Sequence, residues 1–305
     1  MRILRKFEEL RALAQPISWA LGFFDGMHLG HQAVLQSARS EGALCGMLSF
    51  AQHPMSLLCP ERAPLLIQPQ YSQRMATAQA CGVDVLLLLD FTPELAALSP
   101  RDFLQKLACY APIAGISMGD NCHFGYRGQG DAAFLRDYAH QQHWACHIAE
   151  MSLLDGERIC SSRIREVLKM GQLPLVQSMM GRPFSIMGAV EHGQQLARQL
   201  GFATANIALP SDAALPPFGV YAVSSMIDGV CVKGVANLGL RPTIDEAHKV
   251  VRLETHFFNW AGDLYGQQLS IELHQFIRPE QRFSGLAELK AAIAQDSDAA
   301  RTYFT

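Results

Sequence analysis

Short apolar runs alternate with amphipathic segments through roughly the first 180 residues of the chain. The apolar runs lie at 17–24, 43–50, 83–90, 113–119 and 144–150, with helix-like segments between them at 29–40, 101–110 and 132–143. Strands that are apolar along their whole length are buried on both faces, as in a parallel sheet covered by helices. The pattern therefore predicts a doubly wound α/β domain.

The pattern changes from about residue 181. Segments with the composition of β-strands follow one another at 183–193, 204–209, 220–227, 230–238, 250–260 and 268–276. Asp228-Gly229 separates two of them by the dipeptide typical of a type I′ hairpin turn. A helical period returns at 286–294. We therefore expect two domains: residues 1–180, and an antiparallel β-barrel with a C-terminal helix over 181–305.

Composition agrees with a two-domain enzyme of 305 residues, because 49% of the residues are hydrophobic and 17% are charged. A net charge of −3 argues against nucleic acid as a partner, since phosphate backbones attract basic proteins. The eight cysteines form no Cys-Xaa-Xaa-Cys pair, which predicts reduced thiols in a cytoplasmic protein. The apolar run 85–89 is short and bounded by aspartates, so we expect neither a signal peptide nor a membrane span.

A glycine-spaced turn follows the first long apolar run. Gly22, Gly26 and Gly30 let backbone N–H groups approach a ligand closely, and the helix that follows directs its positive end toward the same place. His28 and His31 are three residues apart, so both imidazoles are expected on one face of the first helical turn. The turn therefore predicts an anion site. A purely structural turn or a partial metal site stays open, although no glutamate follows His28 and no cysteine is near.

Residues 22–31, which run Gly-Phe-Phe-Asp-Gly-Met-His-Leu-Gly-His, resemble the HxGH signature of nucleotidyltransferases. The version is the one typical of bacterial FAD synthetases, the bifunctional riboflavin kinase/FMN adenylyltransferases. The resemblance implies that the first domain has the nucleotidyltransferase fold and adenylylates FMN. It implies catalytic roles for His28 and His31, and it places ATP or flavin against Gly22, Phe24, Asp25, Gly26 and Gly30.

The segment 159–165 puts hydroxyls where a helix is expected to begin and arginines on its early turns. On its own it could be an ordinary helix cap with solvated arginines. It is similar to the Ser-Ser-Thr-Xaa-Ile-Arg motif of the same family, whose hydroxyl and basic groups hold the ATP phosphates. The resemblance assigns that role to Ser161, Ser162, Arg163 and Arg165, with Cys160 standing where the family has serine.

A third segment, 119–125, departs further from the family, which usually has Gly-Xaa-Asp-Phe-Arg-Phe-Gly there. Asn121 replaces a carboxylate, and His123 replaces a permanent cation by one that is charged only part of the time. The resemblance places Asn121 in the flavin and nucleotide pocket. The changes indicate either a weakened adenylyltransferase step or loop drift without functional meaning.

In the second domain, residues 201–206 resemble the Gly-Phe-Pro-Thr-Ala-Asn motif of riboflavin kinases, with Ala203 in place of proline. In that family the threonine and asparagine oxygens share a Mg²⁺ ion with the ATP phosphates, which implies Thr204 and Asn206 as metal ligands. Short oxygen-bearing segments suit Mg²⁺, because phosphates and water complete its coordination. The preceding loop resembles the family's glycine loop and implies ATP contacts for Gly193 and Arg198. Residues 234–243, 263–266 and 277–280 match further motifs in order.

Glu254 is the candidate general base of the second domain. Residues 252, 254 and 256 share one face of the expected strand, and residues 253, 255 and 257 share the other. Periodicity alone leaves open a solvent face on which Arg252 pairs with Glu254. Glu254-Thr255-His256 resembles the Glu-Xaa-His segment of riboflavin kinases, in which the glutamate takes the proton of the ribityl 5′-hydroxyl.

The resemblance extends from about residue 16 to the C-terminus. It implies that the chain makes FMN from riboflavin and ATP, then makes FAD and pyrophosphate from FMN and a second ATP. Mg²⁺ is the expected cofactor and these small molecules are the expected partners, with no nucleic acid or membrane. Two alternatives stay open: a riboflavin kinase with a degenerate first domain, and a non-catalytic flavin-binding regulatory protein.

Overall fold

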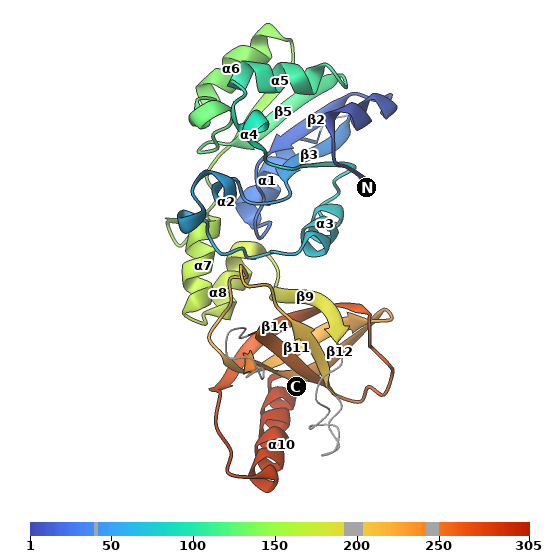
Figure 1. The fold of residues 1–305 in the computed structure, drawn as a ribbon, viewed down its shortest axis with the longest axis vertical. Helices are drawn as coiled ribbons and strands as arrows, with labels where there is room; N and C mark the ends of the chain where they lie inside the picture. Colours follow the sequence, from blue (N-terminus) through green and yellow to red (C-terminus); the bar gives the residue numbers. More distant parts are fainter. Residues whose placement is uncertain (40–41, 192–203, 242–249) are drawn as a thin grey trace. The chain divides into compact units, whose positions relative to one another are not determined.

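The computed structural model describes residues 1–39, 42–191, 204–241 and 250–305. Its contacts divide the chain into two compact units (Figure 1). The α/β unit comprises residues 1–65 and 74–161, and the barrel unit comprises residues 66–73 and 162–305. The predicted domain boundary at residue 180 stays a prediction, and the segment 162–180 groups with the barrel unit.

A six-stranded parallel sheet forms the centre of the α/β unit, with the strand order β1-β4-β3-β2-β5-β6. Its strands are β1 (Arg2–Leu4), β2 (Ile17–Leu21), β3 (Leu44–Phe50), β4 (Val85–Leu89), β5 (Ile113–Gly119) and β6 (Ala145–Ala149). The five strands predicted from apolar runs are confirmed. The sequence missed β1, because this three-residue edge strand is largely exposed and has no apolar run.

Helices cover both faces of this sheet, as the doubly wound prediction requires. Trp19 packs in one core cluster with Phe103 of α5 (Pro100–Ala108) and Leu135 of α6 (Ala132–Gln141). Ala20, the next residue of β2, packs in the other cluster with Leu35 of α1 (Leu29–Ser37) and with α3 (Tyr71–Ala80). Successive residues of a strand point to opposite faces, so one apolar run fills both cores.

Shorter elements complete the first half of the chain and the segment before the barrel. They are η1 (Phe7–Ala12), α2 (Pro54–Leu58), η2 (Pro60–Arg62), α4 (Pro93–Ala96), η3 (Tyr126–Gly128), β7 (Leu153–Leu154), β8 (Glu157–Arg158), α7 (Ser161–Lys169) and α8 (Leu173–Met180). The helix predicted to begin with the serines of segment 159–165 is α7.

The strand order reverses between β2 and β5. From β2 the chain adds β3 and β4 on one side, whereas β5 and β6 lie on the other. In open parallel sheets, ligands bind in the crevice at the carboxyl ends of strands beside such a reversal. The glycine-histidine turn follows β2 and the segment 120–123 follows β5, so the topology brings both to this edge.

The barrel unit contains a closed, all-antiparallel barrel with the strand order β10-β13-β12-β11-β14-β9 (Figure 1). The strands are β9 (Phe184–Glu191), β10 (Ala205–Ala208), β11 (Gly219–Ile227), β12 (Val230–Arg241), β13 (Val250–Phe257) and β14 (Gln268–Pro279). The hairpin prediction is confirmed, because Asp228 and Gly229 have φ angles of 50° and 79° between β11 and β12.

The C-terminal helix α10 (Leu286–Tyr303) continues nine residues beyond the segment that predicted it. Ala300 of α10 is buried in one cluster with Val220 and Val235 of the barrel. Arg278 of β14 donates to both carboxylate oxygens of Asp296, at 2.8 Å from Nε and 2.7 Å from Nη2. Apolar packing and a two-point ion pair therefore hold the helix to the barrel.

All eight cysteines lie in the described part of the chain and are free thiols, in agreement with the sequence. Across residues 1–39, 42–191, 204–241 and 250–305, no helix combines the length and the apolar character needed to cross a membrane.

Candidate active sites

The turn between β2 and α1 has a backbone that glycine and a few strained residues make possible. Phe24, Gly26 and Met27 have φ angles of 59°, 82° and 41°. The buried Phe24 ring folds back over Gly22, where a β-carbon would lie 3.1 Å from Cζ of Phe24. Non-glycine residues with positive φ cost energy and persist where surrounding structure holds them, often at ligand sites.

His28 and His31 form a single unit at the start of α1. His28 is the N-cap residue, and its Nδ1 accepts a hydrogen bond from the backbone N–H of His31 at 3.3 Å. The two rings stack with centroids 3.6 Å apart and planes 18° from parallel. Because Nδ1 of His28 is an acceptor here, a neutral ring carries its proton on Nε2, which makes Nε2 a donor.

This arrangement differs from a metal site. The prediction that both imidazoles project from the first helical turn needs one correction, because His28 caps the helix instead of belonging to it. Capping uses Nδ1 of His28, and stacked rings do not converge on one ion. No group of three or more histidine, cysteine, aspartate or glutamate side chains among the described residues could hold a metal. The partial metal site that the spacing left open is therefore not supported.

Gly30 leaves no room for a side chain on the first turn of α1. A β-carbon there would lie 3.2 Å from Nδ1 and Cε1 of His28 and 3.6 Å from the carbonyl oxygen of Ile159. The close approach keeps the helix N-terminus compact, where backbone N–H groups and the helix dipole favour an anion. The anion site at this turn stays a prediction.

Ser161 closes this turn from a distant part of the sequence. Its Oγ donates to the carbonyl oxygen of the buried Asp25 at 3.0 Å. The other three residues of the predicted phosphate motif follow it on α7, where Arg165 donates to Oγ of Ser162 at 3.2 Å. The barrel unit includes Ser162, Arg163 and Arg165. The phosphate roles assigned to these residues stay predictions.

The segment after β5 reaches the end of β2, as the topology requires. The thiol of Cys122 lies 3.9 Å from the carbonyl oxygen of Leu21, and burial raises the pKa of this thiol to about 11. Oδ1 of Asn121 lies 3.6 Å from the position of a β-carbon on Gly119. Nδ1 of His123 is 3.0 Å from the carbonyl oxygen of Asn121. Asn121 therefore lies at the predicted edge of the sheet.

Arg74 is a structural residue of this site that the sequence did not reveal. It is only 3% exposed, and its guanidinium donates to the carbonyl oxygens of Phe50 and Ala51 at 3.0 and 2.7 Å. Its Cζ lies 4.9 Å from the centroid of the Phe23 ring in the turn. The positively charged side chain of Arg74 therefore packs against the turn and stabilises it. No motif contains Arg74, because its partners are main-chain carbonyls and an aromatic face.

In the barrel unit, strand register aligns three polar residues. Asn206 of β10 is the cross-strand partner of Glu254 on β13, and Glu254 is the partner of Asn237 on β12. Directly opposite residues of an antiparallel pair share a face of the sheet, so the three lie in one row. Asn206 is 4% exposed, and its Nδ2 donates to the carbonyl oxygen and Oγ1 of Thr204, both at 3.3 Å.

The surroundings of Glu254 test the ion pair that its strand pattern left open. Leu253 and Thr255 are fully buried while Glu254 is half-buried, which confirms the alternation expected from the sequence. Arg252, however, donates to Oε2 of Glu191 on β9 at 2.8 Å. Arg252 therefore forms its ion pair with Glu191, and not with Glu254 as the alternative interpretation expected.

Two residues beside this row, Asn237 and Glu280, lie in motifs matched from the sequence but were assigned no role there. Nδ2 of Asn237 donates to Oε1 of Glu280 at 3.2 Å. A side chain on Gly239 would collide with the Glu280 carboxylate, so Gly239 makes room for it. The antiparallel pairing of β12 with β13 was the missing signal, because it alone places Asn237 beside Glu254. Gly193 and Arg198, predicted to contact ATP, lie outside the described residues.

Comparison with known proteins bears on both units. The riboflavin kinase family model matches residues 180–304, and the FAD synthetase family model matches residues 11–163. The chain is 39% identical to the bifunctional riboflavin kinase/FMN adenylyltransferase of Pseudomonas fluorescens, over 99% of this chain and 97% of the relative. The protein of the same name from Escherichia coli K12 is 33% identical, over 100% and 98% of the two chains.

The chain belongs to the bifunctional riboflavin kinase/FMN adenylyltransferase family. The family predicted from the sequence is thereby confirmed. A solved structure described as a macrolide-efflux protein of Streptococcus pneumoniae matches with a TM-score of 0.83 and 24% identity over 99% of both chains. At that identity the likeness shows the fold alone.

Proposed function

We propose that the barrel unit phosphorylates riboflavin to FMN and that the α/β unit transfers AMP from a second ATP to FMN, releasing pyrophosphate. The chain is a transferase of the bifunctional family, and the two family models match separate stretches of it. The observation that carries the proposal is the presence of one site in each unit. The stacked His28 and His31 lie in the α/β unit, and the Asn206–Glu254 row lies in the barrel unit.

In the kinase step, Glu254 acts as the general base. Its carboxylate takes the proton of the ribityl 5′-hydroxyl as this oxygen attacks the γ-phosphorus of ATP, and ADP leaves. A half-buried carboxylate on a rigid central strand suits this role, because its position is fixed by the pairing of β13 with both β10 and β12. Gly193 and Arg198 are proposed to contact the ATP phosphates.

Thr204 and Asn206 are the proposed ligands of Mg²⁺. The hydrogen bonds from Nδ2 to Thr204 turn the amide nitrogen of Asn206 inward and leave its Oδ1 available as an acceptor. Neutral oxygens of this kind suit Mg²⁺, whose remaining positions are usually taken by phosphate and water. When bound, the ion offsets negative charge on the transferred phosphoryl group.

In the adenylyltransferase step, the FMN phosphate is already a competent nucleophile, so the protein mainly positions and stabilises charge. Nε2 of His28, together with His31 and the N–H groups of the glycine turn, donates to the oxygens around the α-phosphorus. Ser161, Ser162, Arg163 and Arg165 hold the polyphosphate that leaves. Flavin binding is proposed beside Asn121, at the edge where β2 and β5 end.

One assay of the purified full chain separates this function from its two alternatives. Riboflavin and Mg·ATP are incubated with the protein, and the flavins are resolved by chromatography. Both FMN and FAD are expected, and chelation of the metal is expected to stop FMN formation. FMN without FAD would indicate a single surviving kinase activity, and neither product would indicate a non-catalytic flavin-binding protein. We also propose a cytoplasmic location, which the free thiols favour.

A further inference from the structure

A short segment from the first half of the sequence is built into the barrel unit. Residues Leu66–Gln73, called the strap below, group with the barrel, although residues on both sides of the strap belong to the α/β unit. At its first residue, the N–H of Leu66 donates to the carbonyl oxygen of Asp212 at 2.6 Å. Its carbonyl oxygen accepts from the N–H of Ala214 at 2.8 Å, which makes a parallel bridge with Ala213.

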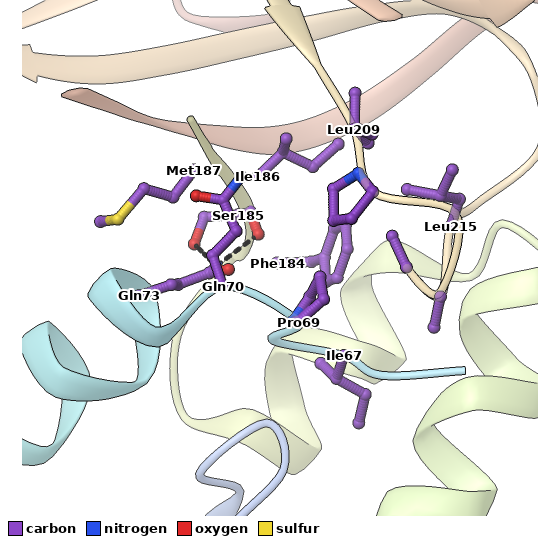
Figure 2. A pocket seen from close by; sticks show the side chains of 13 residues that line it. Ile67, Pro69, Gln70, Gln73, Phe184, Ser185, Ile186, Met187, Leu209 and Leu215 are labelled. Atoms are coloured by element: carbon purple, nitrogen blue, oxygen red, sulfur yellow. Dashed lines mark hydrogen bonds between the residues drawn. The ribbon is translucent and has the colours of Figure 1, made fainter. Parts of the chain in front are cut away.

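The other end of the strap binds strand β9. Nε2 of Gln73 donates to the carbonyl oxygen of Ser185 at 2.7 Å and lies 3.2 Å from its Oγ (Figure 2). The Gln73 side chain is only 4% exposed. Burying an amide is unfavourable unless it is hydrogen-bonded, so these contacts are a specific attachment and not a chance surface contact.

Strand β9 is paired unevenly within the barrel. On one side it pairs with β14 at every position from 184 to 189. On the other side, among the described residues, its pairing with β10 covers only Val190 with Ile207 and Glu191 with Asn206. The first part of β9 therefore has an edge that β10 does not cover, and Gln73 donates to the Ser185 carbonyl there.

The space between the strap and the barrel is too small for a substrate. It encloses only about 20 Å³, between Pro69 and Gln70 of the strap, Phe184 of β9 and Leu215 (Figure 2). Small-molecule sites usually enclose about 300–1,000 Å³. The side chain of Gln70 also approaches Gly188, whose β-carbon would lie 3.5 Å from Nε2 of Gln70. The strap is therefore a structural element that lies along the part of β9 with which β10 does not pair.

We propose that the strap holds the barrel closed along the seam between β9 and β10, and that Gln73 is a positioning residue for the riboflavin kinase step. The seam ends at the pair of Glu191 with Asn206, and Asn206 is a proposed Mg²⁺ ligand. Fixing the start of β9 through Ser185 therefore fixes the strand that Asn206 pairs with. This inference rests on the kinase role proposed for Asn206, and it extends the kinase unit to residues outside its family match at 180–304.

The test uses the full chain and a substitution that keeps the shape of Gln73. Gln73→Glu replaces the donor N–H₂ by an oxygen, which cannot donate to the Ser185 carbonyl when ionised. Gln79→Ala is the matched control, because Gln79 lies on the exposed side of the same helix α3. Should Gln73→Glu fail to fold, Gln73→Met, which is similar in volume and uncharged, carries the same expectations.

Two readouts are expected to move in Gln73→Glu. The KM for Mg·ATP in FMN formation rises by about twofold to tenfold, the fold-change that corresponds to one lost hydrogen bond. Amide hydrogen exchange at Glu191 and Asn206, the cross-strand pair whose N–H groups face the seam, becomes faster by a similar factor, because this opening is local. FAD formation from supplied FMN stays within about twofold of the parent, and Gln79→Ala leaves all three measurements unchanged.

An unchanged KM for Mg·ATP together with unchanged exchange at the seam would overturn the proposal. So would an equal loss of both activities, because that result indicates general destabilisation instead of a seam that serves the kinase site. If the parent itself made no FMN, the kinase assignment would fail, and the exchange experiment would still show whether Gln73 holds β9 against β10.

Discussion

His28 and His31 stack with ring centroids 3.6 Å apart, while Nδ1 of His28 accepts the backbone N–H of His31 at 3.3 Å. One side chain thus performs two tasks that mutation can separate. Its Nδ1 caps helix α1, and its Nε2 is the atom proposed to donate to a phosphate oxygen. A helix cap can be supplied by asparagine, whereas a ring donor at the position of Nε2 cannot.

We therefore predict that His28→Asn keeps the fold but loses FAD formation from FMN by about 10²–10³, the usual cost of removing one preorganised donor. FMN formation from riboflavin should stay near that of the parent, because it takes place in the barrel unit. Initial rates of the two steps, measured separately with each substrate supplied, provide the check. Equal loss of both activities, or of neither, would indicate that the turn is structural.

A second prediction concerns Glu254. Glu254→Gln is nearly isosteric but cannot accept the hydroxyl proton, so FMN formation should fall by about 10²–10⁴. FAD formation from supplied FMN should continue, since the FMN phosphate needs no general base. Glu288→Gln, an exposed carboxylate at the start of α10, serves as the control and should leave both rates unchanged. An FMN rate within about threefold of the parent at saturating riboflavin would exclude the base assignment.

Sequence patterns predicted the elements and the edge at which the first site lies, because both follow from local rules. Apolar runs give buried strands, and the order of strands places the turn after β2 beside Asn121 after β5. Asp228-Gly229 likewise predicted a tight turn, because these two residues tolerate the positive φ angles that the turn requires. Each of these inferences depends on neighbours in the sequence or on general topology.

Two of the missed features depend on pairing between distant segments. Gln73 contacts Ser185 across 112 positions, and a glutamine on a short amphipathic helix is usually exposed to solvent. Asn237 becomes a neighbour of Glu254 only through the register of two strands separated by a turn. The capping role of His28 was missed because three-residue spacing was taken for two helical positions. For Gln73 and Asn237 the deciding fact is a three-dimensional distance between segments, whereas the His28 cap is a local contact with the N–H of His31.

A third prediction follows from His274 of β14. Partial burial lowers the pKa of its imidazole, an effect that the neighbouring Glu272 opposes. Its Nε2 lies 2.8 Å from Oγ of Ser224, and its ring lies 5.4 Å from that of Phe304 at the end of the chain. The folded protein therefore takes up this proton at a lower pH than the unfolded chain, whose histidine pKa is about 6.5.

Stability should accordingly fall on acidification, because the unfolded chain binds the proton first. The contribution of His274 is fully present above about pH 6.5 and is lost as the pH falls through its lowered folded value. His274→Gln should flatten the fall in the free energy of unfolding between pH 7 and pH 5, measured by urea titration at several pH values. Parallel curves for parent and variant would show that His274 does not contribute.

The last prediction concerns the ion pair that attaches α10 to the barrel. Asp296 is buried, and it accepts two hydrogen bonds from the guanidinium of Arg278, whose side chain is 20% exposed. Removing one partner of a buried pair leaves the other charge without compensation and typically costs about 3–5 kcal/mol. Partial exposure of Arg278 allows water to reach it, so the loss in free energy of unfolding for Asp296→Asn should be near the lower end of that range, at about 3 kcal/mol.

Asp298→Asn, two positions away and exposed, is the matched control and should stay within about 0.5 kcal/mol of the parent. Urea unfolding followed by far-ultraviolet circular dichroism measures both variants, and a loss for Asp296→Asn no larger than that of the control would mean that apolar packing around Ala300 alone holds the helix.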